Sequence, residues 1–340
     1  MSRFVAAELV CLLACCAAST RGQEVPVFSA GVESVRLDVL VTDRDRVISG
    51  LQASDFEVRD EGVLQDVEIV GSGMPLNLIL AFDTSASLAG EPFEHLVSAG
   101  QALLDRLRPE DLAGLVTFSH EVSLREGLTR DRARLRRALA AIQPRGETAL
   151  VDGSYAAMML GETDVGRDFV IVFSDGVDTS SWLSEPQVFE AARRCNVVTY
   201  GVSVRGTAAP DFLGRLCWMT GGSLFELDST RDLSATFIQI FEEFRNRYLL
   251  RYTPRGVSGE GWHPIEVRVK GRRGAARVRS GYMAQSGARS GRLDDPRGRD
   301  SAPPSSSSSA ETKAAGNVKD ASGPRGASLD ATTRSPVWWW

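Results

Sequence analysis

The sequence predicts an α/β fold with a mainly parallel sheet, helices on both faces of that sheet, and β-rich segments on either side. Between residues 75 and 247, short apolar runs alternate with segments of helical periodicity. Runs such as LNLILAF (76–82) and DFVIVF (168–173) are apolar at nearly every position. Strands of this kind are buried on both faces and need a layer of helices on each side.

Composition and charge narrow the class of protein. The 340 residues suffice for one large or two ordinary domains, and 43% hydrophobic with 24% charged residues is a globular composition. A net charge of −5 gives no reason to expect nucleic acid as a partner. The chain has three histidines, His95, His120 and His263, which lie far apart in the sequence. This spacing does not favour a histidine-based zinc site or a Ser-His catalytic triad.

Residues 1–22 have the pattern of a targeting segment, in which Arg3 precedes an apolar run and then small residues. We therefore expect a signal peptide and an exported protein, in the periplasm, in the medium or on the cell surface. LLAC (12–15) is similar to a bacterial lipoprotein box, so a lipid anchor at Cys15 is the alternative to simple cleavage. A buried N-terminal helix is the third interpretation.

Two cysteines remain after this segment, Cys195 and Cys217. In an exported protein they either pair or stay as two buried thiols, and the sequence leaves both open.

The first flank, residues 24–73, reads as strands. SVRLDVLVT (34–42) alternates apolar and polar residues, and FEVRDEGVLQDVEIV (56–70) predicts a hairpin turning at Glu61 and Gly62. Residues 248–285 return to strand patterns. Because three strands alone are marginal, we expect the two flanks to share one small β-sandwich into which the 75–247 domain is inserted. Two separate β appendages are the alternative.

Within 75–247 the expected order is strand and helix in alternation. Further strands are expected at 112–119, 196–204 and 223–227. Helices are expected at 92–107, 130–142, 149–161, 186–195, 211–220 and 233–249.

The tail, residues 286–340, is rich in Gly, Ser, Pro and charge, and predicts disorder. Its last residues are Trp338, Trp339 and Trp340. They are either a hydrophobic interaction segment or a chance product of the open reading frame.

Polar residues follow the apolar strands at their carboxyl ends, where open α/β sheets bind ligands. Asp83, Ser85 and Ser87 follow the first strand, Asp175 follows 168–173, and Thr148 precedes the helix at 149–161. Their ligand atoms are all oxygens, mostly neutral hydroxyls, which suits a hard cation such as Mg²⁺, with Mn²⁺ or Ca²⁺ as alternatives. So few carboxylates would leave the ion able to accept an outside carboxylate.

DTSAS (83–87), GETAL (146–150) and FSDGVD (173–178) resemble the metal-ion-dependent adhesion site of von Willebrand factor A-type domains. The resemblance covers 75–247, and the flanks are similar to exported bacterial VWFA-related proteins, extending it to 28–285. It implies a Rossmann-like sheet of about six strands with one antiparallel edge, which we place at EVSLREGL (121–128). It further implies metal ligation, direct or through water, by Ser85, Ser87 and Thr148, with Asp83 and Asp175 binding directly or supporting the ligands.

The function implied is non-enzymatic: Mg²⁺-dependent capture of a protein or peptide that offers an exposed carboxylate. Loops 88–92, 120–126, 145–147 and 177–183 would set specificity. In the last of these, Trp182 and Asp178 are candidate partner contacts; alternatively, Trp182 packs under the loop and Asp178 is only a turn residue.

Other interpretations remain open at this point. Asp83 and Ser85 could cap a helix that starts near Glu91, and Thr148 is well placed to N-cap its own helix. The protein could be a structural envelope protein whose metal only stiffens a loop. A haloacid-dehalogenase-type phosphatase is disfavoured because Ser85 stands where that chemistry needs a second carboxylate. P-loop and dinucleotide glycine motifs do not occur.

Overall fold

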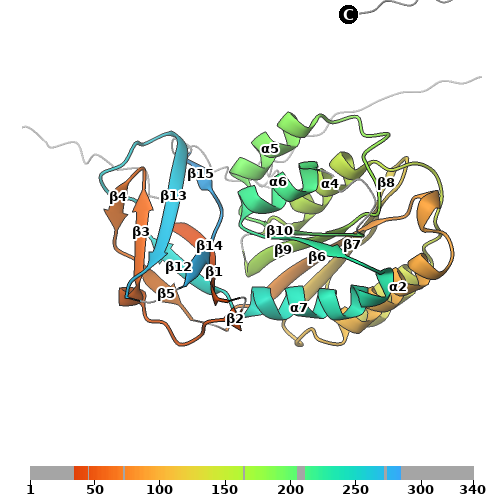
Figure 1. Ribbon diagram of the computed structural model, residues 1–340, viewed down its shortest axis with the longest axis horizontal. Helices are drawn as coiled ribbons and strands as arrows, with labels where there is room; N and C mark the ends of the chain where they lie inside the picture. Colours follow the sequence, from red (N-terminus) through yellow and green to blue (C-terminus); the bar gives the residue numbers. More distant parts are fainter. Residues whose placement is uncertain are drawn as a thin grey trace, which may run out of the picture. The chain divides into compact units, whose positions relative to one another are not determined.

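The computed structural model describes residues 34–284, apart from 45, 72, 164, 205–210 and 272–273 (Figure 1). The predicted signal peptide, the lipid anchor at Cys15 and the predicted disordered tail with its three tryptophans lie outside the described residues.

A six-stranded sheet forms the centre of the α/β region, in the order β11-β10-β9-β6-β7-β8. Its strands are β6 (Leu76–Asp83), β7 (Leu112–Phe118), β8 (Val122–Thr129), β9 (Arg167–Phe173), β10 (Val198–Val204) and β11 (Leu224–Leu227). Every neighbouring pair is parallel except β7 and β8. The fold class and the antiparallel edge strand predicted at 121–128 are therefore confirmed.

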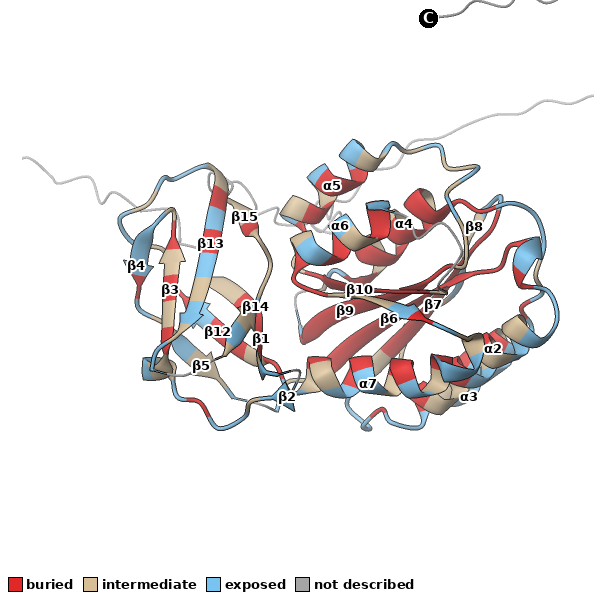
Figure 2. Ribbon diagram, viewed as in Figure 1, coloured by how far each residue is buried: buried red, intermediate tan, exposed pale blue. Residues whose placement is uncertain are grey.

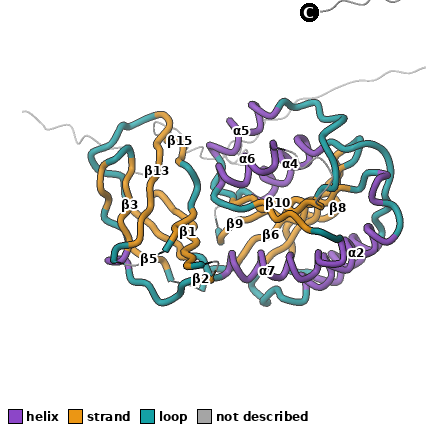
Figure 3. Tube along the Cα trace, viewed as in Figure 1, coloured by secondary structure: helices purple, strands orange, loops and turns teal. Residues whose placement is uncertain are grey.

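Helices cover both faces of this sheet (Figures 1 and 3). They are α2 (Glu91–Leu104), α3 (Arg132–Ala140), α4 (Leu150–Gly161), α5 (Glu185–Arg194), α6 (Asp211–Thr220) and α7 (Leu233–Arg245). Side chains of α2, α3 and α7 share one buried core with Leu78, Leu80 and Phe82 of β6. Those of α4, α5 and α6 share another with Ile79 and Ala81. The period of two along β6 thus divides its side chains between the two cores, which explains why the strand is apolar throughout (Figure 2).

The helix predicted at 233–249 ends earlier, at Arg245. Its last predicted residues belong to β12, because Tyr248 and Leu249 pair with Val39 and Asp38 in a sheet of the flanks.

The two flanks form two sheets together. One has the order β14-β1-β12-β5, with β2 paired to β1, and the other β15-β13-β3-β4. Their strands are β1 (Val35–Asp43), β2 (Arg46–Val47), β3 (Phe56–Asp60), β4 (Val63–Gln65), β5 (Glu68–Val70), β12 (Tyr248–Tyr252), β13 (Gly261–Val269), β14 (Ala275–Arg277) and β15 (Gly281–Ala284). Pairing of β1 with β12 and of β3 with β13 joins the flanks, which excludes two separate appendages. Leu37 and Leu250 from one sheet pack with Phe56 and Val58 from the other in a single core.

A buried ion pair ties the flanking sheets to the α/β region. Arg167 Nη2 lies 2.5 Å from Asp38 Oδ1 of β1. Arg167 is the first residue of β9 and pairs with Leu76, the first residue of β6. The contact is therefore at the amino edge of the sheet, the end opposite Asp83.

Cys195 and Cys217 are both buried and both free, so the disulfide alternative is wrong. In the part of the chain that the structure describes, every helix is too short or too polar to cross a membrane.

Candidate functional site

Three loops that are far apart in the sequence meet at the carboxyl edge of the sheet. The amide of Arg145 donates to the carbonyl of Thr84 at 2.7 Å, and the amide of Ala86 donates to the carbonyl of Gly146 at 3.0 Å. The amide of Thr179 donates to the carbonyl of Thr148 at 2.8 Å. Because β6 and β9 are adjacent parallel strands, Asp83 and Asp175 leave the sheet side by side.

Four of the five predicted site residues form one connected network of oxygens. Ser85 Oγ lies 2.9 Å from Ser87 Oγ, and Ser87 Oγ donates to Asp175 Oδ1 at 3.1 Å. Asp83 Oδ1 accepts from the amide of Ser85 at 2.8 Å, and Asp83 Oδ2 accepts from Ser174 Oγ at 2.6 Å. The network runs from buried Asp83 and Ser85 to exposed Ser87 and half-buried Asp175.

Thr148 lies against the loop that carries Asp175. Its amide donates to Thr179 Oγ1 at 3.0 Å, and a Cβ added to Gly176 would lie 3.9 Å from Thr148 Oγ1. The hydrogen bonds of the network join the other four residues to one another and to Ser174. Thr148 therefore lies near the network without being part of it.

The prediction that Thr148 caps its helix is wrong. The N-cap of α4 is Ala149, with no side-chain capping bond, and the amide of Val151 donates to Asp178 Oδ1 at 3.2 Å. Asp178, which lies on another loop, thus accepts a hydrogen bond from the first turn of α4 in place of a capping residue. The Thr148 hydroxyl does not cap the helix.

The capping alternative for Asp83 and Ser85 is also wrong. The N-cap of α2 is Gly90, whose φ of 92° and lack of a side chain leave the helix without a side-chain cap. Asp83 and Ser85 are bonded instead to Ser174 and Ser87.

Two carboxylates share this partly buried edge. Burial raises the pKa of Asp83 to about 6; hydrogen bonds from Ser174 and Ser85 oppose the rise, and the charge of Asp175 adds to it. Burial also raises the pKa of Asp175. The edge is therefore suited to take up either protons or a metal cation.

The loop after β9 is fastened to the start of α4. Asp152 Oδ2 accepts from the amide of Trp182, and Asp152 Oδ1 from that of Leu183, both at 2.9 Å. The Trp182 side chain is 95% exposed, so the alternative that it packs under the loop is wrong. Its contact with a partner, like that of Asp178, stays a prediction.

Sequence reasoning missed Ser174 and Asp152. Ser174 stands between the last strand residue and Asp175, and its position at the strand end was a usable signal. Asp152 was hidden in the first turn of a helix, where an acidic residue is ordinary.

Within the described residues, no group of three or more His, Cys, Asp or Glu side chains is gathered so as to hold a metal ion. A cation at this edge would therefore depend on hydroxyl oxygens together with the two carboxylates.

Residues 78–178 match the family model of the von Willebrand factor type A domain. This match covers less than a third of the chain, and the six-stranded sheet with helices on both faces has a von Willebrand factor type A-like fold. The matched segment includes all five predicted site residues. It begins in β6, the strand that ends at Asp83.

Sequence comparison relates the chain to a cyanobacterial protein. It is 33% identical over 183 residues to "Uncharacterized protein sll0103" of Synechocystis sp. (strain ATCC 27184 / PCC 6803 / Kazusa). The match covers 51% of this chain and 42% of that protein, so the chain spans less than half of this relative.

Solved structures show more distant likenesses to part of the chain. Proximal thread matrix protein 1 from the mussel byssus, with a zinc-occupied MIDAS motif, is 19% identical with a TM-score of 0.45, covering 53% of this chain and 48% of that one. The SpRpn10 VWA domain is 18% identical with a TM-score of 0.40, covering 49% and 95%. The PilB minor pilin of Streptococcus sanguinis is 12% identical with a TM-score of 0.42, covering 51% and 62%. At these TM-scores the likenesses carry no argument about function.

Proposed function

We propose that the protein is a non-enzymatic binding module that captures a protein or peptide ligand through a metal ion. Asp83, Ser85, Ser87, Thr148 and Asp175 would hold Mg²⁺, with Mn²⁺ and Ca²⁺ as alternatives. The observation that carries the proposal is the hydrogen-bonded network that gathers the hydroxyls of Ser85 and Ser87 with the carboxylates of Asp83 and Asp175 at one edge of the sheet.

The oxygens of this network lie close enough together to hold one small hard cation jointly. The distances from Ser85 Oγ to Ser87 Oγ and from Ser87 Oγ to Asp175 Oδ1 are 2.9 and 3.1 Å.

Each residue has a distinct part in the proposed site. Ser174 and the amide of Ser85 fix both oxygens of Asp83, so this carboxylate is orientated before anything binds. Ser85, Ser87 and Thr148 offer neutral oxygens, and only two carboxylates would offset the ionic charge. When bound, the ion would supply an electrophilic position that an outside carboxylate can complete.

Binding is a better proposal than hydrolysis because of Ser85. It stands two residues after Asp83, where a phosphatase of the haloacid dehalogenase type needs a second carboxylate. Its hydroxyl is bonded to Ser87 instead. With this function we propose an extracytoplasmic location, supported by the signal-like pattern of residues 1–22.

Metal-dependent stability tests the site. Mg²⁺ at ten times its Kd should stabilise the protein by about 1.4 kcal/mol, seen as a rise in Tm, and Asp83→Ala should abolish the rise. Asp66→Ala is the matched control, because Asp66 is 95% exposed in the first flank. If millimolar Mg²⁺, Mn²⁺ and Ca²⁺ all leave the Tm unchanged, the proposal is wrong. If metal stabilises the protein but acidic peptides never bind, the structural-protein alternative is favoured.

A further inference from the structure

Two large apolar side chains are exposed on the loop that carries Asp175 of the proposed site. Val177 is 49% exposed, and Trp182, at 95%, is more exposed than any other large hydrophobic residue that the structure describes. Both belong to the loop that begins with Asp175. Single exposed apolar residues are common on protein surfaces, so the argument depends on how this loop is held.

The backbone around Trp182 is fixed while its ring lies in water. The Asp152 carboxylate binds the amides of Trp182 and Leu183, and the amide of Asp152 donates to Ser181 Oγ at 3.1 Å. Leu183 packs against the core under α4. Among the described residues, Trp182 takes part in none of the ring–ring or cation–π contacts. The ring is therefore presented by an ordered loop, without a stabilising contact of its own.

Such an arrangement favours binding. Because the backbone of Trp182 is held before association, only its side-chain rotamers have to be ordered when it is covered, and tryptophans are frequent hot spots of interfaces. Trp182 follows Asp175 by seven residues along a loop that is tied back to Thr148 by hydrogen bonds from the amides of Thr179 and Ser180.

The other segments expected to set specificity are more mixed. Arg145 and Glu121 form an ion pair at 2.5 Å. Gly146 has a φ of 76°, and a Cβ there would overlap the imidazole of His120, so this ring closes over the backbone. Leu124 of the 120–126 segment is 62% exposed, but Trp182 offers the most exposed large apolar side chain of these loops.

We propose that Trp182, with Val177 of the same loop, is the specificity-determining contact of this site. Its ligand is then an exposed peptide segment of a partner protein, in which an acidic residue stands next to an aromatic or large aliphatic one. The acidic group of the peptide would bind the metal ion, and its apolar side chain would cover the indole of Trp182. A bare carboxylate or an acidic sugar would make only the metal contact. This inference rests on the proposed function.

Three capped peptides test it by NMR titration in Mg²⁺: acetyl-Phe-Asp-Phe-amide, acetyl-Ala-Asp-Ala-amide and acetyl-Phe-Asn-Phe-amide. We expect the Phe-Asp-Phe peptide to bind about 5–10-fold more tightly than the Ala-Asp-Ala peptide, from the ring contact with Trp182. Trp182→Ala should bring this ratio near 1 and leave Ala-Asp-Ala binding unchanged. Trp182→Phe should keep part of the ratio.

Trp218→Ala is the matched control. Trp218 is 72% exposed on α6 and lies beside residues of β13 and β14, so removing it should leave the ratio intact. A ratio that survives Trp182→Ala overturns the inference and leaves the proposed function standing. Failure of the wild-type protein to bind either acidic peptide also overturns the inference. Binding of the Phe-Asn-Phe peptide as tightly as Phe-Asp-Phe, or no effect of Asp83→Ala, contradicts the proposed function itself.

Discussion

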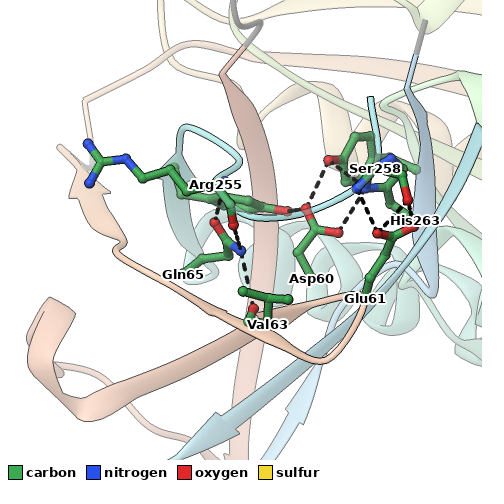
Figure 4. A network of polar contacts seen from close by, with 9 residues as sticks. Asp60, Glu61, Val63, Gln65, Arg255, Ser258 and His263 are labelled. Atoms are coloured by element: carbon green, nitrogen blue, oxygen red, sulfur yellow. Dashed lines mark hydrogen bonds and ion pairs between the residues drawn. The ribbon is translucent and has the colours of Figure 1, made fainter. Parts of the chain in front are cut away.

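Asp60 in the flanking sheets and Asp83 in the α/β region are both fully buried, yet their surroundings differ. Asp60 Oδ1 lies 3.0 Å from His263 Nδ1, and Asp60 Oδ2 accepts from the hydroxyls of Tyr252 and Tyr282 at 2.8 and 2.9 Å (Figure 4). Asp83 accepts from one amide and one serine hydroxyl, and its neighbour is a second carboxylate.

The Asp60 network is closed, because all its partners lie inside the protein, whereas the Asp83 network is open, because it reaches the solvent. The donors to Asp60 come from β12 in one sheet and from β13 and β15 in the other, so the carboxylate ties the two sheets together. The Asp83 network continues to exposed Ser87 and half-buried Asp175. A buried carboxylate that is satisfied within the protein supports the fold, whereas one that opens to solvent is suited to a ligand.

The largest effect is expected from a substitution that removes the centre of the closed network, Asp60. Asp60→Ala leaves His263 and two tyrosine hydroxyls buried without their acceptor, and should lower the free energy of unfolding by about 3–5 kcal/mol in urea denaturation. Tyr252→Phe removes one bond and should cost about 1 kcal/mol. Equal, small losses from both variants would contradict the view that Asp60 organises the sandwich.

The second prediction concerns pH in EDTA. Burial raises the pKa of Asp83 to about 6, from 3.8. Between these values the folded protein keeps a proton that the unfolded chain has lost, so the free energy of unfolding should fall as pH rises from about 4 to 6. We expect a loss of about 1–2 kcal/mol from this group, since one pKa unit is worth about 1.4 kcal/mol and the site opens to screening solvent at Asp175.

Asp168 provides the comparison. Burial raises its pKa to about 6 as well, and it accepts from Asn77 and Thr163 at the amino edge of the sheet. Asp83→Asn and Asp168→Asn should each flatten part of the pH dependence in EDTA. Saturating Mg²⁺ should remove only the Asp83 part, because metal holds the deprotonated carboxylate. Equal action of Mg²⁺ on both parts would place the metal elsewhere.

The smallest expected effect is on Mg²⁺ affinity and tests the role of Ser174. Ser174→Ala removes the hydroxyl that orientates Asp83. It should weaken Mg²⁺ binding about 10-fold and lower the free energy of unfolding without metal by about 1 kcal/mol. Ser180→Ala is the nearby control, since its buried hydroxyl has no hydrogen-bond partner among the described residues. Isothermal calorimetry would distinguish the two; identical affinities would show that Asp83 needs no such support.

The sequence by itself determined the layered α/β fold, the edge strand at 121–128 and the set of candidate oxygens at strand ends. Apolar runs without alternation require cover on both faces, and parallel strands bring their carboxyl ends to one edge. These two rules are enough to place Asp83 and Asp175 at the same edge of the sheet.

Only the tertiary structure decided which side chains cooperate. Asp178 rather than Thr148 caps α4, Ser174 fixes Asp83, and Asp152 holds the loop that leaves Trp182 in water. The network around Asp60 likewise joins strands that are far apart in the sequence. Local patterns cannot reveal such pairs, because a hydrogen bond between distant segments depends on how loops and sheets pack, and each of these residues has an ordinary local role available to it.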